Sequence, residues 1–188
     1  MQNLIDTFRK IGQLKPENEQ ALLSSIEKKT YPPRTLLQDQ EKISNKIYFI
    51  EKGIARTYYY KDGKDITHWI ASENNFVGSM TSFFMQVPSN KLVETIDECI
   101  LWEFEFKKLQ TLFKTNQDLA HAGRLFAIYG MSLLEQRFDN LHFNTAKERY
   151  QILMNNNPEI IQRVPLGMIA SYLGITQETL SRIRNNTF

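Results

Sequence analysis

The spacing of apolar residues along the chain changes from helical to strand-like and back again. Residues 2–28 show helical periodicity, and Pro16 opens the second of two short helices expected there. From Tyr31 the pattern becomes one of short segments rich in β-branched and aromatic residues, separated by turns. Helical periodicity returns after Glu105. This order predicts an α+β protein whose strands form one contiguous domain at about residues 30–105.

The clearest turn of the predicted β domain is Lys61-Asp62-Gly63-Lys64. A glycine after aspartate supplies the positive φ that a tight hairpin needs, so the flanking segments TYYY and ITHWI are expected to pair as strands. Many short strands at this spacing favour a sandwich or a barrel.

The segment from Asn116 to Phe143 contains no proline and is predicted to form one long helix. Apolar positions recur along it every three or four residues: Leu119, Ala122, Phe126, Tyr129 and Leu133. A helix of about four heptads with this spacing is typical of one that pairs with a second copy of itself. Gly123 and Gly130 would permit two backbones to approach closely. The alternative is a helix packed on the β domain of its own chain.

The C-terminal region contains the start and stop signals of further helices. Thr145-Ala-Lys-Glu148 has the capping-box pattern, and Val164-Pro165 begins another helix after the Asn157-Pro158 breaker. Gly174 can adopt the left-handed backbone conformation that commonly ends an α-helix, and Thr176 can cap the helix that follows. Two helices joined by a glycine turn, with apolar residues at these offsets, are typical of the helix-turn-helix motif of DNA-binding proteins.

Polar side chains remain on the outer or flanking positions of the last helix: Gln177, Thr179, Ser181, Arg182 and Arg184. Glutamine and arginine make bidentate contacts with base edges, and hydroxyl groups bind phosphates. This chemistry suits a helix that lies in a DNA groove. An ordinary helix pair with a solvated face is the alternative.

Charge, cysteine content and the length of apolar runs narrow the classes of protein to which this chain can belong. The formal net charge of +2 is too small to indicate nucleic-acid binding by itself, so DNA contact requires a local patch. The single cysteine, Cys99, cannot form an internal disulfide or an iron–sulfur site, and it suits a reducing compartment. The N-terminus does not resemble a signal peptide, and no apolar run approaches the roughly 18 residues of a membrane helix. We therefore expect a cytoplasmic protein without a membrane partner.

An enzyme is the competing class, because β-rolls also house metal oxygenases and isomerases. The three histidines, His68, His121 and His142, form neither an H-x-H nor an H-x-x-E-H pattern. The sequence also has no phosphate loop, nucleophile elbow or cysteine–histidine pair. We therefore predict no enzymatic activity and no metal site. A haem ligand role for His68 or Cys99 is conceivable only in principle, and Cys99 is interpreted as a small buried apolar residue.

With these motifs in this order, nearly the whole chain resembles the Crp/Fnr family of bacterial transcription regulators. The most specific stretch is TAKERYQILMNNNPEIIQRVPLGMIASYLGITQETLSRIR, residues 145–184, which is similar to a subgroup common in Bacteroidetes. The resemblance implies a cyclic-nucleotide-binding-like β-roll (a double-stranded jelly roll) at 1–115, a dimerisation helix at 116–143 and a helix-turn-helix domain at 144–188.

The sequence departs from the family in the nucleotide cassette. Family members that bind cAMP hold its ribose hydroxyl with a glutamate that follows a glycine, and its phosphate with an arginine about ten residues on. Here Gly78 is present, but Ser79 stands in place of the glutamate, and Ser89 or Asn90 in place of the arginine. An anionic phosphate loses its charge-assisted partner, so cAMP is not the expected effector.

The pocket itself is still expected, and its predicted residues are Val77, Gly78, Ser79, Met80, Ser89, Asn90 and Lys91. Apolar residues dominate this neighbourhood. Two outcomes are open, namely an unidentified small-molecule effector of apolar character, or a filled core without any ligand or cofactor.

By alignment with the family, base-edge contacts fall to Gln177, Glu178 and Arg182, and phosphate contacts to Thr176, Thr179 and Ser181. Glu178 either accepts from a cytosine amino group or only provides a favourable charge at the helix start. No hairpin wing is expected after Arg184, so backbone anchoring falls to the first helix of the motif, to the segment around Lys147, Arg149 and Arg163, and to a second subunit.

The sequence thus predicts a homodimeric transcription regulator that binds double-stranded DNA and has RNA polymerase as a further possible partner. An effector would act by shifting the relative orientation of two recognition helices. A constitutive DNA binder with a vestigial pocket is one alternative. A ligand-binding or protein-interaction module with little DNA affinity is the other.

Overall fold

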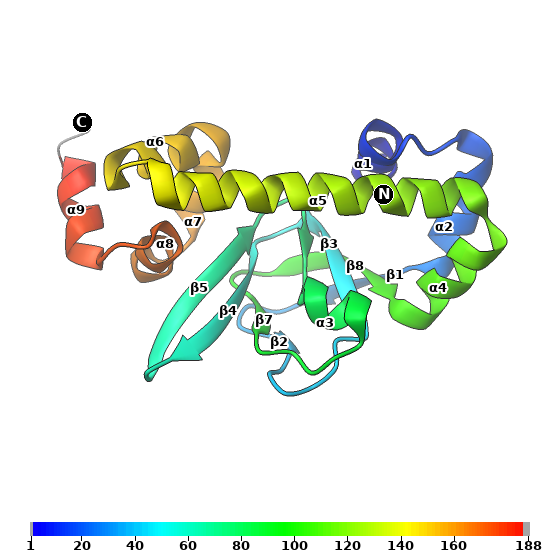
Figure 1. Ribbon diagram of the computed structural model, residues 1–188, viewed down its shortest axis with the longest axis horizontal. Coiled ribbons are helices and arrows are strands. Elements are labelled where there is room, and N and C mark those ends of the chain that lie inside the picture. The colour runs from blue at the N-terminus through cyan, green and yellow to red at the C-terminus, as the bar shows by residue number, and fades with distance from the viewer. Residues whose placement is uncertain (1, 186–188) are drawn as a thin grey trace.

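The computed structural model describes residues 2–185. They form a β-sandwich with one long helix lying along it, and the shorter helices gather in two groups near the two ends of that helix (Figure 1). Two antiparallel four-stranded sheets make the sandwich, in the orders β1-β8-β3-β6 and β2-β7-β4-β5. The strands are β1 (Glu27–Tyr31), β2 (Leu36–Gln38), β3 (Lys46–Lys52), β4 (Ala55–Lys61), β5 (Lys64–Ala71), β6 (Phe76–Val77), β7 (Leu92–Thr95) and β8 (Cys99–Glu105). The contiguous β domain predicted from the sequence is confirmed.

The first strand begins earlier than the sequence pattern indicated, at Glu27 instead of near residue 30. Strand β1 has the sequence EKKTY and lies at the edge of its sheet, with its first four residues exposed. An exposed polar edge strand carries no alternation of apolar residues, so periodicity could not locate it.

The predicted hairpin turn is confirmed between β4 and β5. The two strands pair from Ala55 opposite Ala71 to Lys61 opposite Lys64. Asp62 and Gly63 both have positive φ, at 52° and 73°, which is the backbone conformation that the Asp-Gly pair favours.

The N-terminal helices gather at one end of the sandwich together with α4. They are α1 (Gln2–Gly12), η1 (Pro16–Asn18) and α2 (Glu19–Ser25), and α4 covers Phe106–Thr115. Leu4 and Phe8 of α1 are buried in one core cluster with Trp102 and Phe104 of β8. The Phe8 and Phe104 rings stack with centroids 5.8 Å apart, which ties the first helix to the last strand.

The long helix α5 runs from Gln117 to Phe143 along the length of the molecule (Figure 1). The Asn116 side chain caps it by accepting a hydrogen bond from the Leu119 backbone N–H at 3.0 Å. Its first half packs on α1, where the Phe126 and Phe8 ring centroids are 4.4 Å apart. The predicted extent of this helix matches its observed bounds to one residue.

The first residues of the predicted dimer seam on α5 pack within the chain, whereas Tyr129 stays 42% exposed, so the seam as a whole remains a prediction. Leu119 and Ala122 are buried, Phe126 packs on the same cluster, and Tyr129 and Leu133 line a cavity beside β5. A Cβ at Gly123 would lie 2.4 Å from the Phe113 ring of α4, so that glycine serves a contact within the chain. Helical spacing reveals an apolar face but not what covers it.

The Leu119→Ala variant tests this assignment. Leu119 is 1% exposed in the monomer core, so we expect the variant to lower the free energy of unfolding by about 2–5 kcal/mol. Urea unfolding measures this change. A loss of self-association with little change in the urea midpoint would instead place Leu119 in a contact between two subunits, as the sequence predicts.

Four helices complete the chain: α6 (Ala146–Asn156), α7 (Pro158–Arg163), α8 (Leu166–Leu173) and α9 (Gln177–Asn185). The predicted capping box at Thr145 and Glu148 is present at the start of α6. The predicted helix breaker is confirmed, because α6 ends at Asn156; the short helix α7, which was not predicted from the sequence, follows with Pro158 in its first turn. Among residues 2–185, no helix combines the length and the apolar character needed to cross a membrane.

Candidate nucleic-acid interface and effector pocket

Helices α8 and α9 are joined by a tight turn at Gly174. This glycine has φ of 68°, and its backbone N–H donates to carbonyl groups at the end of α8. The hydroxyl of Thr176 accepts from the Thr179 backbone N–H at 3.2 Å and so caps α9. Leu180 is fully buried against α8 residues such as Ile169. Both local signals found in the sequence therefore fix the angle at which α9 leaves the turn.

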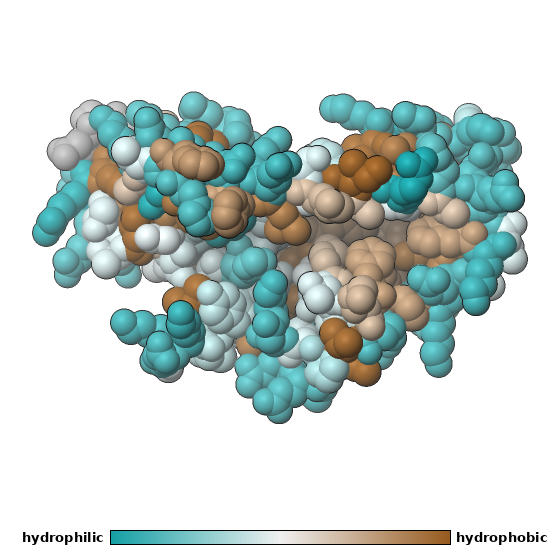
Figure 2. Space-filling model, viewed as in Figure 1, coloured by the Kyte–Doolittle hydropathy of each residue, from teal (hydrophilic) through white to brown (hydrophobic). Residues whose placement is uncertain are grey.

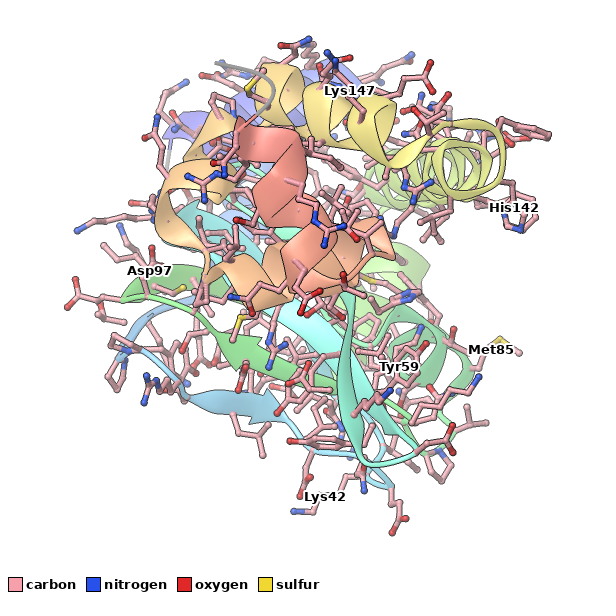
Figure 3. All side chains as sticks on the ribbon, turned by 90° about the vertical axis from the view of Figure 1, so that its left-hand side faces the viewer. Lys42, Tyr59, Met85, Asp97, His142 and Lys147 are labelled. Atoms are coloured by element: carbon pink, nitrogen blue, oxygen red, sulfur yellow. The ribbon has the colours of Figure 1, made fainter. Side chains whose placement is uncertain are left out.

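The polar residues of α9 lie on its outer face. Six of the seven predicted contact residues are exposed, and Thr179 is half-buried; the exposed ones are Thr176, Gln177, Glu178, Ser181, Arg182 and Arg184. In Figure 3, α9 faces the viewer in front of the other C-terminal helices. Within residues 2–185, Arg182 and Arg184 make no ion pair. Their guanidinium groups are available to an external anion.

Two of the three residues assigned to backbone anchoring are engaged within the chain. Arg163 binds Glu73 at 2.8 Å and Asp97 at 2.5 Å, which joins α7 to the sandwich. Arg149 donates to the carbonyl oxygens of Leu173 and Asn144. Lys147 is exposed and projects outward (Figure 3). The expectation that no wing follows Arg184 concerns residues 186–188, which lie outside the described part of the chain.

The C-terminal helices are docked on the second sheet. The Thr67 backbone N–H of β5 donates to the Ser171 hydroxyl of α8 at 2.9 Å. The Ser72 hydroxyl donates to Glu159 of α7 at 2.6 Å. Ile54 and Ile70 of the sandwich belong to the same core cluster as α6–α9. The position of α8, on which α9 packs, is thus set by contacts with β5.

The residues predicted for the effector pocket surround helix α3 (Met80–Met85) and the loop before β7. Ser79 and Ser89 are buried, and their hydroxyl oxygens lie 2.7 Å apart. Ser89 also bonds both backbone groups of Lys91. Ser79, expected from the sequence at the glutamate position, and Ser89, one of the two candidates for the arginine position, are thus joined by one neutral hydrogen bond.

The other predicted pocket residues divide between interior and surface. Val77 is fully buried, Met80 is half-buried, and a Cβ at Gly78 would lie 2.9 Å from Ile47. Asn90 is exposed, so it does not line an interior pocket, in contrast to the sequence interpretation. The turn at Ser89 points that hydroxyl inward and the next side chain outward.

Lys91 is half-buried and lies beside a histidine. Its ammonium Nζ is 3.1 Å from Nε2 of His68 on β5, which accepts the hydrogen bond. Burial, with the charges of Lys91 and Arg137, lowers the pKa of His68 to about 4, so its imidazole is neutral near pH 7. Burial also lowers the pKa of Lys91.

The serine pair predicts a measurable stability effect. The Ser89→Ala variant leaves the buried Ser79 hydroxyl without its partner, so we expect a loss of about 1–3 kcal/mol in the free energy of unfolding. Urea unfolding of Ser89→Ala, with the exposed Ser24→Ala as the matched control, measures it. Equal midpoints for the two variants would show that the serine pair does not hold the cassette.

Sequence reasoning missed the buried arginine Arg56 and its two carboxylate partners. Arg56 of β4 is 3% exposed and donates to Asp65 through two nitrogens at 2.6 Å and to Glu94 at 2.7 Å. Its guanidinium also lies 4.0 Å from the Tyr58 ring centroid. Two carboxylates neutralise this buried cation, so its role is to join β4, β5 and β7. Asp65 and Glu94 lie far apart in the sequence, so no motif marks them.

No group of three or more histidine, cysteine, aspartate or glutamate side chains suited to a metal ion occurs within residues 2–185. Cys99 is buried, and burial with the nearby Asp97 carboxylate raises the pKa of its thiol to about 12. A thiol in this state is a poor nucleophile and a poor metal ligand.

Comparison with known proteins places this geometry among cyclic-nucleotide-binding folds. Residues 28–116 match the family model of the cyclic nucleotide-binding domain. A search of curated protein sequences found no match. A solved structure that resembles the chain is the c-di-GMP-responsive global regulator CLP of Xanthomonas campestris. It is 20% identical with a TM-score of 0.66, and 92% of this chain and 91% of that chain are covered.

Two further solved structures give the same result. FixK2 of Bradyrhizobium japonicum is 18% identical with a TM-score of 0.67, and 86% of this chain and 83% of that chain are covered. The catabolite activator protein of Thermus thermophilus is 17% identical with a TM-score of 0.57, and the coverage is 92% and 83%. At these identities the likeness establishes the fold, and the β-sandwich is of the cyclic-nucleotide-binding type.

Proposed function

We propose that the protein is a homodimeric, sequence-specific DNA-binding transcription regulator of the Crp/Fnr type, and not an enzyme. The observation that carries the proposal is the outer face of α9, where Gln177, Arg182 and Arg184 are exposed on a capped helix next to a glycine turn. Arginine and glutamine at the start and middle of such a helix suit base edges and phosphates. The fold shared with regulators supports the same assignment. The subgroup resemblance of residues 145–184 is part of the proposal.

The second subunit is proposed to bind a different face of α5 from the one that the sequence indicated. We call this face the exposed α5 stripe, and its residues are Ala127, Met131, Leu134, Phe138 and Leu141. They follow one another at steps of four, three, four and three, which is the heptad spacing of a coiled coil. Met131 is 70% exposed and Phe138 58% exposed, so the isolated chain leaves this seam uncovered.

Two more features of this face favour a second copy as its occupant. Gly130 lies beside the stripe, and a Cβ there would meet nothing within 4 Å, so a partner backbone has room to approach. Phe84 and Met85 of α3 are also exposed, and Met85 projects on the same side as His142 of α5 (Figure 3). Apolar surface covers α5 and α3 on the face shown in Figure 2. One partner helix would cover both.

Dimerisation would also meet the electrostatic need of a small DNA-binding surface. The outer face of α9 offers two free arginines, and protein–DNA affinity depends largely on the number of phosphates that a protein neutralises. A second subunit doubles that number. It also sets two recognition helices at a fixed separation, which a palindromic site can match.

The serine pair argues against cAMP as effector. The Ser79 and Ser89 hydroxyls satisfy each other, and the nearest cation, Lys91, is turned to His68. A cyclic phosphate would have to break these contacts without gaining a bidentate arginine. We propose that the regulator does not respond to cAMP.

The proposal is tested by selecting genomic fragments with the purified full-length protein in the absence of nucleotide. Affinity for the best fragment is then measured with and without cAMP. We expect enrichment of a near-palindromic site and no change with cAMP. A tenfold rise in affinity with cAMP would overturn the effector claim, and no enrichment under either condition would favour a protein-interaction module.

A further inference from the structure

A cavity of about 270 Å³ lies where the second half of α5 meets the sandwich and the C-terminal helices. We call it the α5 cleft. Its walls come from β5, α5, α6, α7 and α8, and in Figure 1 these elements surround the end of α5 that is remote from the N-terminal helices. It is separate from the cassette around Ser79 and Ser89, neither of which lines it. The volume is near the lower end of the range for small-molecule sites.

The polar lining of the α5 cleft is unbalanced in charge. Two arginines, Arg137 and Arg149, line it together with five carboxamide side chains, Asn75, Gln136, Asn140, Asn156 and Asn157. No aspartate or glutamate stands among the lining residues that the structure describes. Carboxamides can donate hydrogen bonds to an anion, and guanidinium groups add both charge and paired donors.

The two guanidinium groups are held next to each other by α8. Arg137 donates to the carbonyl of Tyr172 at 2.8 Å, and Arg149 donates to the next carbonyl, that of Leu173, at 2.9 Å. The Arg137 guanidinium also stacks on the Tyr172 ring at 3.8 Å. These contacts leave part of the five donors of each group unused, because a guanidinium has more N–H groups than the contacts employ.

The arginines of the cleft differ from two other arginines that connect elements of the fold. Arg56 and Arg163 each bind two carboxylates. Arg137 and Arg149 bind only neutral groups, and neither makes an ion pair within residues 2–185. Two adjacent cations that share no counter-ion repel each other, and an anion between them would remove that repulsion.

A further cation, Lys91, lies near the two arginines of the cleft. His68 lies close enough to Arg137 for the arginine charge to lower its pKa, and Lys91 follows on the far side of the imidazole. Burial and the neighbouring Arg149 also lower the pKa of Arg137 itself. The other wall is aromatic and apolar, with Trp69, Tyr129 and Leu133, which suits the carbon skeleton of an organic ligand.

We propose that the α5 cleft binds a small organic anion, with its phosphate or carboxylate group between Arg137 and Arg149. The carboxamides of Asn140 and Asn156 would donate to the remaining oxygens, and the skeleton would lie against Trp69. The site does not depend on DNA binding. Because its walls include both β5 and α8, occupancy would join the sandwich to the motif that carries α9.

The test is a titration of the full-length protein with inorganic phosphate and, separately, with succinate, followed through the NMR signals of the arginine Nε–H groups. We expect saturable shifts of the Arg137 and Arg149 signals with at least one of the two anions, and no saturable shift for Arg124, an exposed arginine of the same helix. Saturation by one anion alone identifies the acid group of the ligand. Linear shifts at all three arginines would overturn the proposal.

The Asn140→Asp variant separates ligand binding from a purely structural role of the arginines. The introduced carboxylate would lie one turn after Arg137 on α5 and provide an internal counter-ion. We therefore expect a higher melting temperature and about tenfold or greater loss of anion affinity. Arg124→Gln removes a charge from the same helix and should retain full affinity. Unchanged anion binding in Asn140→Asp would contradict the assignment of the site.

Discussion

Replacing Arg182 and Arg184 together by glutamine is expected to lower the affinity for the selected DNA fragment by about 100-fold or more. Both side chains are exposed on α9 and free of internal ion pairs within the described residues, so the variant removes the proposed contacts with DNA and no ion pair of the described chain. A dimer loses four cations. The slope of log affinity against log salt should therefore fall by about 3–4, since each phosphate contact adds about 0.9. Fluorescence anisotropy at several salt concentrations measures both quantities.

The matched control is the double variant Lys10→Gln and Lys114→Gln. It removes the same charge from exposed positions at the opposite end of the molecule, in α1 and α4. The control should keep the affinity of the natural chain within about twofold, because charges beyond a Debye length of the DNA are screened. Equal losses in both double variants would mean that overall charge, and not α9, determines binding.

Replacing Leu134 by glutamate is expected to convert the proposed dimer to a monomer. The exposed α5 stripe places Leu134 at the centre of the proposed seam, and burying a leucine side chain contributes about 1.5–3 kcal/mol. Two such side chains are lost in each dimer, so the dissociation constant should rise about 100-fold or more. Analytical ultracentrifugation across a concentration series measures the change.

Leu36→Glu is the control for that experiment. Leu36 of β2 is 48% exposed and Leu134 is 50% exposed, so the same substitution at similar exposure distinguishes the stripe from general surface effects. Leu36→Glu should remain dimeric, and both variants should unfold at similar urea concentrations. A dimer that survives Leu134→Glu would place the subunit contact elsewhere.

The sequence was sufficient for elements whose signals are local. The Asp62-Gly63 turn, the capping box at Thr145 and the glycine end of α8 each depend on residues within a few positions, and all three are present. The long helix was also predicted closely, because a proline-free apolar period of this length has few other solutions.

The seam on α5 shows a limit of sequence reasoning. The helix has two apolar faces, one through Leu119 and Ala122 and another through Met131 and Leu134. Both have steps of three and four, so spacing alone could not say which face the chain covers with its own α1 and sandwich. The seam predicted from the sequence lies on the first face, of which Leu119 and Ala122 are buried in the monomer core while Tyr129 is 42% exposed.

The arginines illustrate the same limit for sites. Nothing in the local sequence distinguishes Arg163, which binds two carboxylates, from Arg182, which makes no ion pair with any described residue. The partners of Arg163, Glu73 and Asp97, are remote in sequence. The Arg137 and Arg149 pair was missed for the same reason, since α8 brings them together through two backbone carbonyls. The only sequence feature that marks this pair is that one arginine precedes the end of the long helix and the other follows it.

Hydroxyl-radical footprinting of the selected fragment tests the central claim most directly, namely that two copies of α9 read DNA from one dimer. The account predicts two protected stretches whose centres lie about one helical turn, 10–10.5 base pairs, apart, both of which disappear with the Arg182 and Arg184 double variant. A single protected stretch, or protection that survives the double variant, would contradict it.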